Sequence, residues 1–204
     1  MNIKSLAELV QDEAVFSSSL LKVAGIRSNQ VQVQLVRWVR AGRLLKLRRG
    51  LYVLAKPYRK IEPHPFLMAN RLQRGSYVTF QSALAYYGLI PEHVPVVTSA
   101  TMGRPETVHT PLGSFLFRHL KTSMVTGFRQ VKVADRQEAI IATPEKALVD
   151  LLYVTAGSDS DGYLEELRLQ SIEPGLSRDG LALHAETTGS RKVKRALARI
   201  LKML

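Results

Sequence analysis

The chain has 204 residues, of which 46% are hydrophobic and 23% are charged, the proportions of an ordinary globular protein. It contains no cysteine, which excludes disulfide bonds, iron–sulfur clusters and thiolate-bound zinc. No apolar run is long enough to span a membrane and the first ten residues lack the apolar core of a signal peptide, so we expect a cytoplasmic protein without a membrane partner.

The net charge of +12 is concentrated at the two ends of the chain. Residues 1–60 hold twelve Lys and Arg but only three acids, and residues 190–204 hold six Lys and Arg and no acid. The long segment between them contains more acids than bases. A near-neutral body with two basic ends indicates a polyanionic partner that meets defined surfaces. The simpler alternative is that the extra cations only aid solubility.

The first part of the chain shows the element order of a winged helix-turn-helix. Ser5 and Glu8 have the spacing of a capping box, which predicts that a short first helix begins at Ser5. The apolar periodicity then predicts a helix over 17–24, a helix over 29–41, and a hairpin whose strands cover 44–47 and 51–54.

The third predicted helix has two chemically different faces. Val31, Leu35 and Trp38 fall on one side and form a stripe that suits a core. The opposite side can read base edges, because Gln pairs with adenine, Arg pairs with guanine and Val touches the thymine methyl group. The plainer alternative is a set of ordinary solvated side chains. The predicted base-reading residues are Asn29, Gln30, Val33, Gln34 and Arg37.

Basic residues around this helix are expected to contact DNA phosphates. Arg48 and Arg49 at the hairpin tip, together with Lys46, can lie against the backbone or enter a minor groove. Such contacts set the affinity and its salt dependence but carry little sequence information. Four further cations are either phosphate contacts or plain surface: Lys22, Arg27, Arg40 and Arg43.

Prolines at 57, 63 and 65 predict a linker over 57–65, between a DNA-binding domain over 1–56 and a C-terminal domain over 66–204. We expect an α+β fold, in which an N-terminal winged helix-turn-helix precedes a mixed C-terminal domain. The expected elements of that domain are helices over 66–73 and 79–87, strands over 94–101, 114–119, 128–133 and 139–142, a helix starting at Thr143, and helices over 163–170, 178–187 and 191–203.

The last of these helices combines an apolar stripe with a basic side. Three interpretations stay open for it. It can be a core helix with solvated cations, a second phosphate-binding face, or a helix that binds a partner.

No catalytic or metal-binding motif stands out. The five histidines are scattered without metal-ligand spacing, and there is no Gly-rich phosphate loop or nucleophile elbow. We therefore expect no catalytic residue, metal or cofactor, and a protein that is not an enzyme. The adjacent Glu145 and Lys146 leave a metal-dependent nuclease as an alternative, although Glu145 suits a helix start and Lys146 can pair with Asp150.

Several short motifs, taken together in order and spacing, resemble the AbiEi family, the antitoxins of type IV toxin–antitoxin systems from bacterial abortive-infection operons. Each tetrapeptide alone is a weak match, and the last fifty residues contribute nothing. The residues that carry the resemblance are Gly50-Leu51-Tyr52, Ser82-Ala83-Leu84, Tyr87-Gly88-Leu89, Arg104-Pro105, Thr110 to Gly113, Phe115 to Lys121, and Ala142 to Tyr153.

The resemblance implies a winged-helix N-terminal domain and a C-terminal antitoxin domain. It also implies a repressor that binds repeated operator sequence in its own promoter and opposes a nucleotidyltransferase toxin without forming a stable complex with it. The alternative is a stand-alone winged-helix transcription factor whose C-terminal domain senses a ligand or partner.

Overall fold

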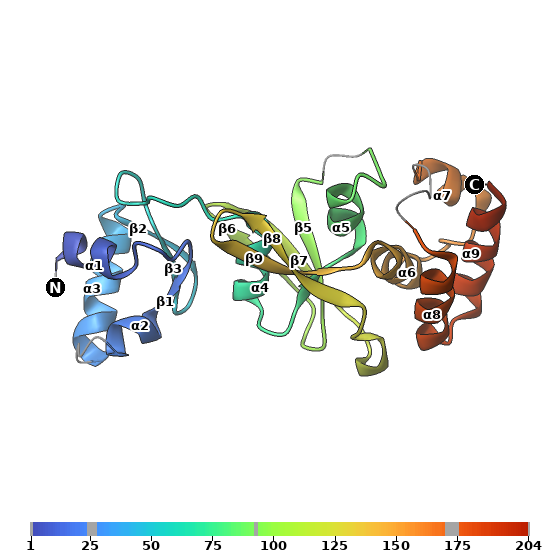
Figure 1. Cartoon of the computed structure of the whole chain (residues 1–204). Helices are drawn as coiled ribbons and strands as arrows, with labels where there is room; N and C mark the ends of the chain where they lie inside the picture. Colours follow the sequence, from blue (N-terminus) through green and yellow to red (C-terminus); the bar gives the residue numbers. More distant parts are fainter. Residues whose placement is uncertain (1, 24–27, 92–93, 170–175, 204) are drawn as a thin grey trace.

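The computed structural model describes residues 2–23, 28–91, 94–169 and 176–203 of the chain. It is a mixed α+β fold with two β-sheets, elongated along one direction (Figure 1). The elements from α1 to β3 are called here the N-terminal unit, and those from α4 to α9 the sheet unit. The N-terminal unit lies at one end, the larger sheet in the middle, and α6 to α9 at the other end.

The N-terminal unit packs helices against a small antiparallel sheet of order β1-β3-β2. Phe16 pairs with Tyr52, and Leu45 with Val53. Its core is built from Leu6, Leu21 and the buried face of the third helix. Its elements are α1 (Ile3–Leu9), β1 (Phe16–Ser17), α2 (Ser18–Val23), α3 (Ser28–Arg40), β2 (Leu44–Arg48) and β3 (Leu51–Leu54).

The start of α1 differs from the prediction. Asn2, not Ser5, is the N-cap, and its side chain accepts a hydrogen bond from the Ser5 backbone N–H at 2.8 Å. Asn is as good a cap as Ser. Starting at Ile3 gives the helix two buried anchors one turn apart, Ile3 and Leu6, which a start at Ser5 would not provide.

The sheet unit is built on a mixed sheet of order β6-β7-β5-β4-β9-β8. The pairs β5/β7 and β4/β9 are parallel, and the other neighbours are antiparallel. The central strands are buried on both faces, so helices or the N-terminal unit must cover each side. The strands are β4 (Tyr77–Val78), β5 (Val96–Thr101), β6 (Glu106–Thr110), β7 (Gly113–His119), β8 (Phe128–Ala134) and β9 (Gln137–Ala142).

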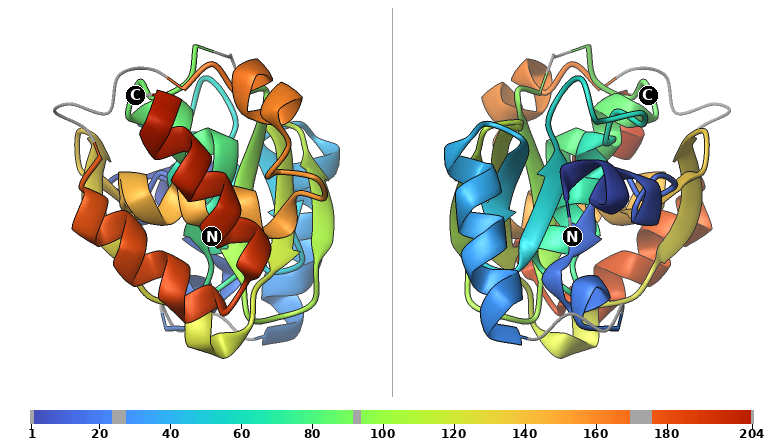
Figure 2. Two further views of the ribbon diagram at one scale, coloured as in Figure 1. Left: turned by 90° about the vertical axis from the view of Figure 1, so that its right-hand side faces the viewer. Right: turned by 90° about the vertical axis from the view of Figure 1, so that its left-hand side faces the viewer.

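Helices cover both faces of this sheet. The helix α4 (Pro65–Leu72) lies on the side of the N-terminal unit, whereas α5 (Phe80–Tyr86) and α6 (Pro144–Val154) lie on the other (Figure 1). Two antiparallel helices, α8 (Arg178–Thr188) and α9 (Arg191–Met203), pack outside α6, with α7 (Asp161–Glu166) beside them (Figure 2). A short 3₁₀ turn covers Thr122–Met124.

The expected linker over 57–65 contains no strand, and its last residue, Pro65, already begins α4. The units on either side of it are not independent in packing. Val15, Leu47, Leu51 and Val53 of the N-terminal unit belong to the same hydrophobic cluster as the core of the sheet unit. Within the described ranges, no helix is long and apolar enough to cross a membrane.

Candidate nucleic-acid interface

The helix α3 is fixed to the N-terminal unit by one face. Val31, Leu35 and Trp38 are 1–3% exposed and lie in one cluster with residues from α1, α2 and β3. These positions repeat every three or four residues, which aligns them along one side of a helix. The stripe expected from the sequence is therefore the anchoring side, and it determines which side chains point outward.

The predicted base-reading residues share the outward side of α3. Gln30 and Arg37 are exposed, Val33 is 52% exposed and Gln34 is half-buried. No side-chain hydrogen bond or ion pair within the described residues engages Gln30, Gln34 or Arg37, so their polar groups are available to a partner. The side chain of Asn29 lies outside the described residues.

One apolar residue of this surface was not predicted. Val36 is 47% exposed, beside the predicted Val33 on the helical wheel. The helical wheel could have predicted this exposure, because it places Val36 outside the core stripe, between that stripe and the outward side. Val36 therefore lies at the edge of the outward side, next to Val33 and away from Gln34.

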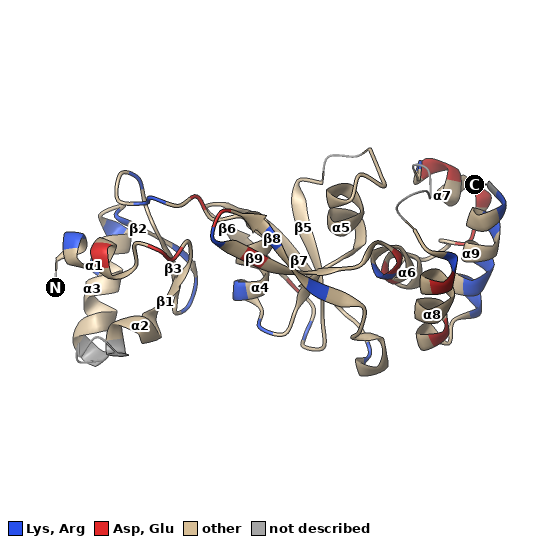
Figure 3. Ribbon diagram, in the orientation of Figure 1, with Lys and Arg blue, Asp and Glu red and all other residues tan. Residues whose placement is uncertain are grey.

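A basic rim continues from the end of α3 into the hairpin. Arg40, Arg43, Lys46 and Arg49 are all exposed, as expected for phosphate contacts or plain surface. Figure 3 shows Lys and Arg on both the N-terminal unit and α9. Arg27 lies outside the described residues, as does the side chain of Lys22, so the structure places neither of them.

Arg48 does not take the position expected of a DNA contact. Its guanidinium donates to the backbone carbonyl of Leu72 and forms an ion pair with Glu106 at 3.3 Å. Leu72 ends α4, where carbonyl groups lack intrahelical partners and the helix dipole is negative, so this end attracts a cation. Arg48 thus joins the hairpin to the sheet unit, whereas Arg49 makes no side-chain hydrogen bond or ion pair with the residues that the structure describes.

The turn itself is held against the rest of the N-terminal unit. The Ser18 backbone N–H donates to the Gly50 carbonyl at 2.8 Å. Gly50 has a φ of +81°, a conformation that favours glycine, and a Cβ there would also meet the Ser18 hydroxyl at 3.4 Å. The hairpin is consequently fixed on two sides, by Ser18 and through Arg48.

Two of the three acids in the first sixty residues face the sheet unit. Asp12 pairs with Arg136 at 2.7 Å, and Glu13 lies 3.8 Å from Arg71. These ion pairs hold both acids at the junction between the N-terminal unit and the sheet unit. Within the described residues, no ion pair joins the exposed cations of α3 and the hairpin to an acid, which favours a positive potential on that surface.

The residues that suggested a nuclease have structural roles. Lys146 and Asp150 form an ion pair in which both side chains are at most 1% exposed. Glu145 accepts a hydrogen bond from the Ser177 backbone N–H at 2.9 Å. Among the described residues, no group of three or more His, Asp or Glu is placed to hold a metal ion.

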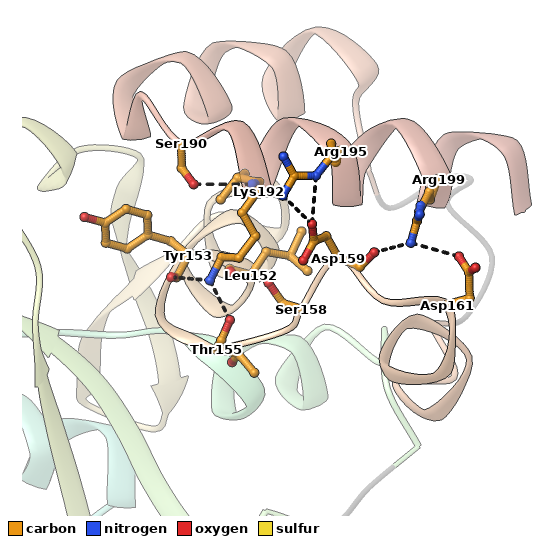
Figure 4. Close-up of polar contacts among 11 residues, drawn as sticks. Leu152, Tyr153, Thr155, Ser158, Asp159, Asp161, Ser190, Lys192, Arg195 and Arg199 are labelled. Atoms are coloured by element: carbon orange, nitrogen blue, oxygen red, sulfur yellow. Dashed lines mark hydrogen bonds and ion pairs between the residues drawn. The ribbon is translucent and has the colours of Figure 1, made fainter.

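The basic side of α9 is largely engaged in contacts within the sheet unit (Figure 4). Lys192 donates to the carbonyls of Tyr153 and Thr155, and Arg195 and Arg199 pair with Asp159 and Asp161 respectively. On the other side, Val193, Ala196, Leu197 and Ile200 are buried. Of the three interpretations given to this helix, the packed core helix accounts for most of its residues.

The comparisons with known proteins bear on the fold alone. No protein-family model matches the chain, and no curated protein does. Among solved structures, that of the RV2827C protein from Mycobacterium tuberculosis is similar, with a TM-score of 0.53 and 15% sequence identity. The similarity covers 96% of this chain and 79% of that one, so the two share their overall fold across both units.

Proposed function

We propose that this protein binds double-stranded DNA and represses transcription, with its N-terminal unit acting as a winged helix-turn-helix. The observation that carries the proposal is the outward side of α3, where Gln30, Val33 and Arg37 are exposed opposite a fully buried stripe. Thirteen helical residues span about 20 Å. A helix of this length enters a major groove, where amide and guanidinium groups distinguish base pairs.

The basic rim supplies the sequence-independent part of the binding. Arg40, Arg43, Lys46 and Arg49 are exposed and follow one another along the chain from the last residue of α3 to the hairpin turn. Contacts from such residues to phosphates position the helix in the groove and make the affinity fall as salt rises. Arg48, already bound to Leu72 and Glu106, has a positioning role in this proposal: it orients the hairpin.

The resemblance to the AbiEi family extends the proposal to the biological role. The protein acts in the cytoplasm as the autorepressor and antitoxin of a type IV toxin–antitoxin system. Its DNA partner is repeated operator sequence in its own promoter, and it counters a nucleotidyltransferase toxin without a stable complex. No enzymatic step and no cofactor enters this role.

The DNA-binding proposal is tested by titrating DNA from upstream of the gene with single variants of α3 and the turn. Gln34→Ala should lower affinity for the preferred sequence by about 5- to 150-fold, which corresponds to the loss of one base contact of ~1–3 kcal/mol. Arg49→Ala should weaken binding to all sequences and reduce the slope of affinity against salt by about one phosphate contact.

Gln32→Ala is the matched control for these variants. Gln32 is exposed on the same helix, but it lies well away from Gln34 around the helix axis, so its removal should leave binding unchanged. Wild-type binding by both Gln34→Ala and Arg49→Ala would show that the proposed reading surface is wrong.

The antitoxin role needs a separate experiment. The reading frame directly downstream is expressed alone and together with this protein, and bacterial growth is measured. The proposal expects a nucleotidyltransferase that arrests growth when alone and is tolerated in the presence of this protein. Growth arrest that this protein does not relieve would remove the antitoxin role and leave the DNA-binding proposal standing.

A further inference from the structure

A cavity of about 480 Å³ lies at the end of the six-stranded sheet where the parallel strands β5 and β7 begin. The start of α4, the end of α5 and the turn before β7 form its walls. Its volume is within the usual range of small-molecule sites, which is roughly 300–1,000 Å³. None of its lining residues plays a part in the contacts proposed for DNA.

Aromatic rings form a continuous wall on one side of this cavity. The rings of Phe66 and Tyr86 lie 5.7 Å apart, and His64 meets Phe66 edge-to-face at 5.1 Å. Tyr86 is 41% exposed although it ends a helix of the core, so a large part of its ring is unpacked. Leu112, in the turn before β7, and Phe115 of β7 contribute further apolar lining.

The described residues give the cavity few polar side chains, and His64 is the one whose geometry fixes a hydrogen-bond donor. The Nδ1 atom of His64 accepts a hydrogen bond from the Phe66 backbone N–H at 3.2 Å, because His64 caps α4. In a neutral imidazole this places the proton on Nε2, which makes Nε2 a hydrogen-bond donor. Burial lowers the pKa of His64, which favours this neutral form.

The charge of the residues that line the cavity indicates which charge a ligand can carry. Among the residues that the structure describes, the lining includes Ser82 and Ser114 but no Lys, Arg, Asp or Glu. An ionised ligand would lose its hydration there without gaining an opposite charge, which makes its binding unfavourable. An aromatic wall favours flat rings, since these stack with offset or edge-to-face contacts.

We propose that this cavity is a binding site for an uncharged, flat heteroaromatic molecule. Its ring packs against Phe66 and Tyr86, and a ring nitrogen or carbonyl oxygen accepts a hydrogen bond from His64 Nε2. The site gives the sheet unit a ligand-binding activity that is separate from DNA binding.

The test uses the full chain without DNA and quinoxaline as the probe, a neutral two-ring compound with acceptor nitrogens. Saturation-transfer NMR measures its contact with the protein, because a ligand of this size is expected to bind with a dissociation constant on the order of millimolar. Quinoxaline should show saturation transfer and shift the His64 ring signals, whereas quinoxaline-2-carboxylate should bind at least five-fold more weakly.

Variants locate the binding. Ala85→Phe places a ring into the cavity and Tyr86→Ala removes part of its wall, so each should reduce saturation transfer at least five-fold. Ala182→Phe adds the same ring at an exposed position of α8 and is the matched control. Circular dichroism checks that each variant is folded.

The proposal is overturned if quinoxaline shows no transfer with the wild type at millimolar concentration, or if folded Ala85→Phe binds it as the wild type does. Equal binding of the carboxylate also overturns it. Because no DNA is present, these results leave the DNA-binding proposal untouched.

Discussion

Lys146 and Asp150 form a buried ion pair one helical turn apart in α6. The Asp150 carboxylate also accepts hydrogen bonds from the hydroxyls of Tyr77 and Thr79, each at 3.0 Å. Burial raises the pKa of Asp150 and lowers that of Lys146, and the mutual attraction of the pair opposes both shifts. The network links α6 to β4 and to the start of α5, so the pair ties helix to sheet.

Removing one partner of this pair should be strongly destabilising. Asp150→Asn leaves the Lys146 ammonium buried without a counter-ion, and we expect a loss of about 3–5 kcal/mol in the free energy of unfolding. Urea denaturation measures it. The control is Asp135→Asn, which breaks the exposed pair with Lys132 and should cost at most about 1 kcal/mol. Equal costs for the two variants would contradict a structural role for the buried pair.

His184 is a second buried group whose protonation affects stability. Its ring packs against Gly127, where a Cβ would approach to 2.3 Å, and its Nδ1 atom has no partner within the described chain. Burial, and then the nearby Lys146, lower its pKa below the ordinary 6.5, while Glu145 opposes the shift.

The sign of the pH dependence follows from this shift. Below about pH 6.5 the unfolded chain binds a proton at His184 that the folded chain does not, so folding stability falls as the pH falls. Urea titrations from pH 7.5 to 5 should show the wild type losing up to about 1.4 kcal/mol per pH unit more than His184→Gln. His109→Gln, on the exposed strand β6, is the control. Parallel curves for wild type and His184→Gln would disprove the prediction.

At the scale of elements, the sequence predicted the extent of the terminal helix α9 but not the contacts of its cations. The bounds 191–203 and the apolar stripe were predicted correctly. The role of the cations was not, because it depends on α6 ending beside α9 in space. Lys192 donates to the carbonyls of Tyr153 at 2.9 Å and Thr155 at 2.5 Å, and so satisfies groups at the end of α6 that have no partner within that helix.

This capping contact predicts unequal effects for two neighbouring lysines. Lys192→Met should lower the free energy of unfolding by about 1.5–3 kcal/mol, the usual contribution of hydrogen bonds to charged groups. Lys194→Met, exposed on the same helix, should change it by less than about 0.5 kcal/mol. Thermal denaturation of both variants compares them. If Lys194→Met lowered the free energy of unfolding more than Lys192→Met, the contact of Lys192 with α6 would not be what stabilises the fold.

The sequence predicted long elements with a clear period and missed short or polar ones. The helix α3, the start of α6 and the strand β3 were placed to within a residue or so, since caps and apolar periodicity act locally. The two-residue strands β1 and β4 carry no period. Strand β6 alternates between half-buried and exposed residues, but its sequence, Glu106 to Thr110, is mostly polar, and only pairing with β7 makes it a strand.

The candidate interface could likewise be predicted only where it depends on local periodicity. Helical periodicity placed Gln30, Val33 and Arg37 outward. The diversion of Arg48 to Leu72 and Glu106 was not predictable, because those partners lie 24 and 58 residues further along the chain.

At the scale of the whole molecule, the shared hydrophobic cluster predicts cooperative unfolding. Leu47, Leu51 and Val53 of the hairpin are buried together with residues of the sheet unit, so neither unit can open without exposing this surface. Trp38, the single tryptophan, reports on the N-terminal unit, whereas circular dichroism reports on the whole chain. Both signals should give one coincident urea transition.

A substitution within the shared cluster sharpens this prediction. Leu47→Ala should shift the coincident transitions to lower urea, with a loss of about 2–5 kcal/mol. If the Trp38 transition moved alone while the circular dichroism stayed at the wild-type midpoint, the units would be independent and the prediction wrong.

The bond between Arg48 and the end of α4 has a consequence for how such a protein can be divided. A fragment that stops before the sheet unit would keep every side chain proposed to face a duplex, yet it would lose the partners that orient the hairpin beside α3. Grafting residues 1–56 onto an unrelated domain would therefore transfer the side chains proposed to contact DNA, but not the contacts that orient the hairpin. The orientation of the hairpin therefore depends in part on Glu106, which lies 58 residues after Arg48 in the sequence and is not among the residues proposed to contact DNA.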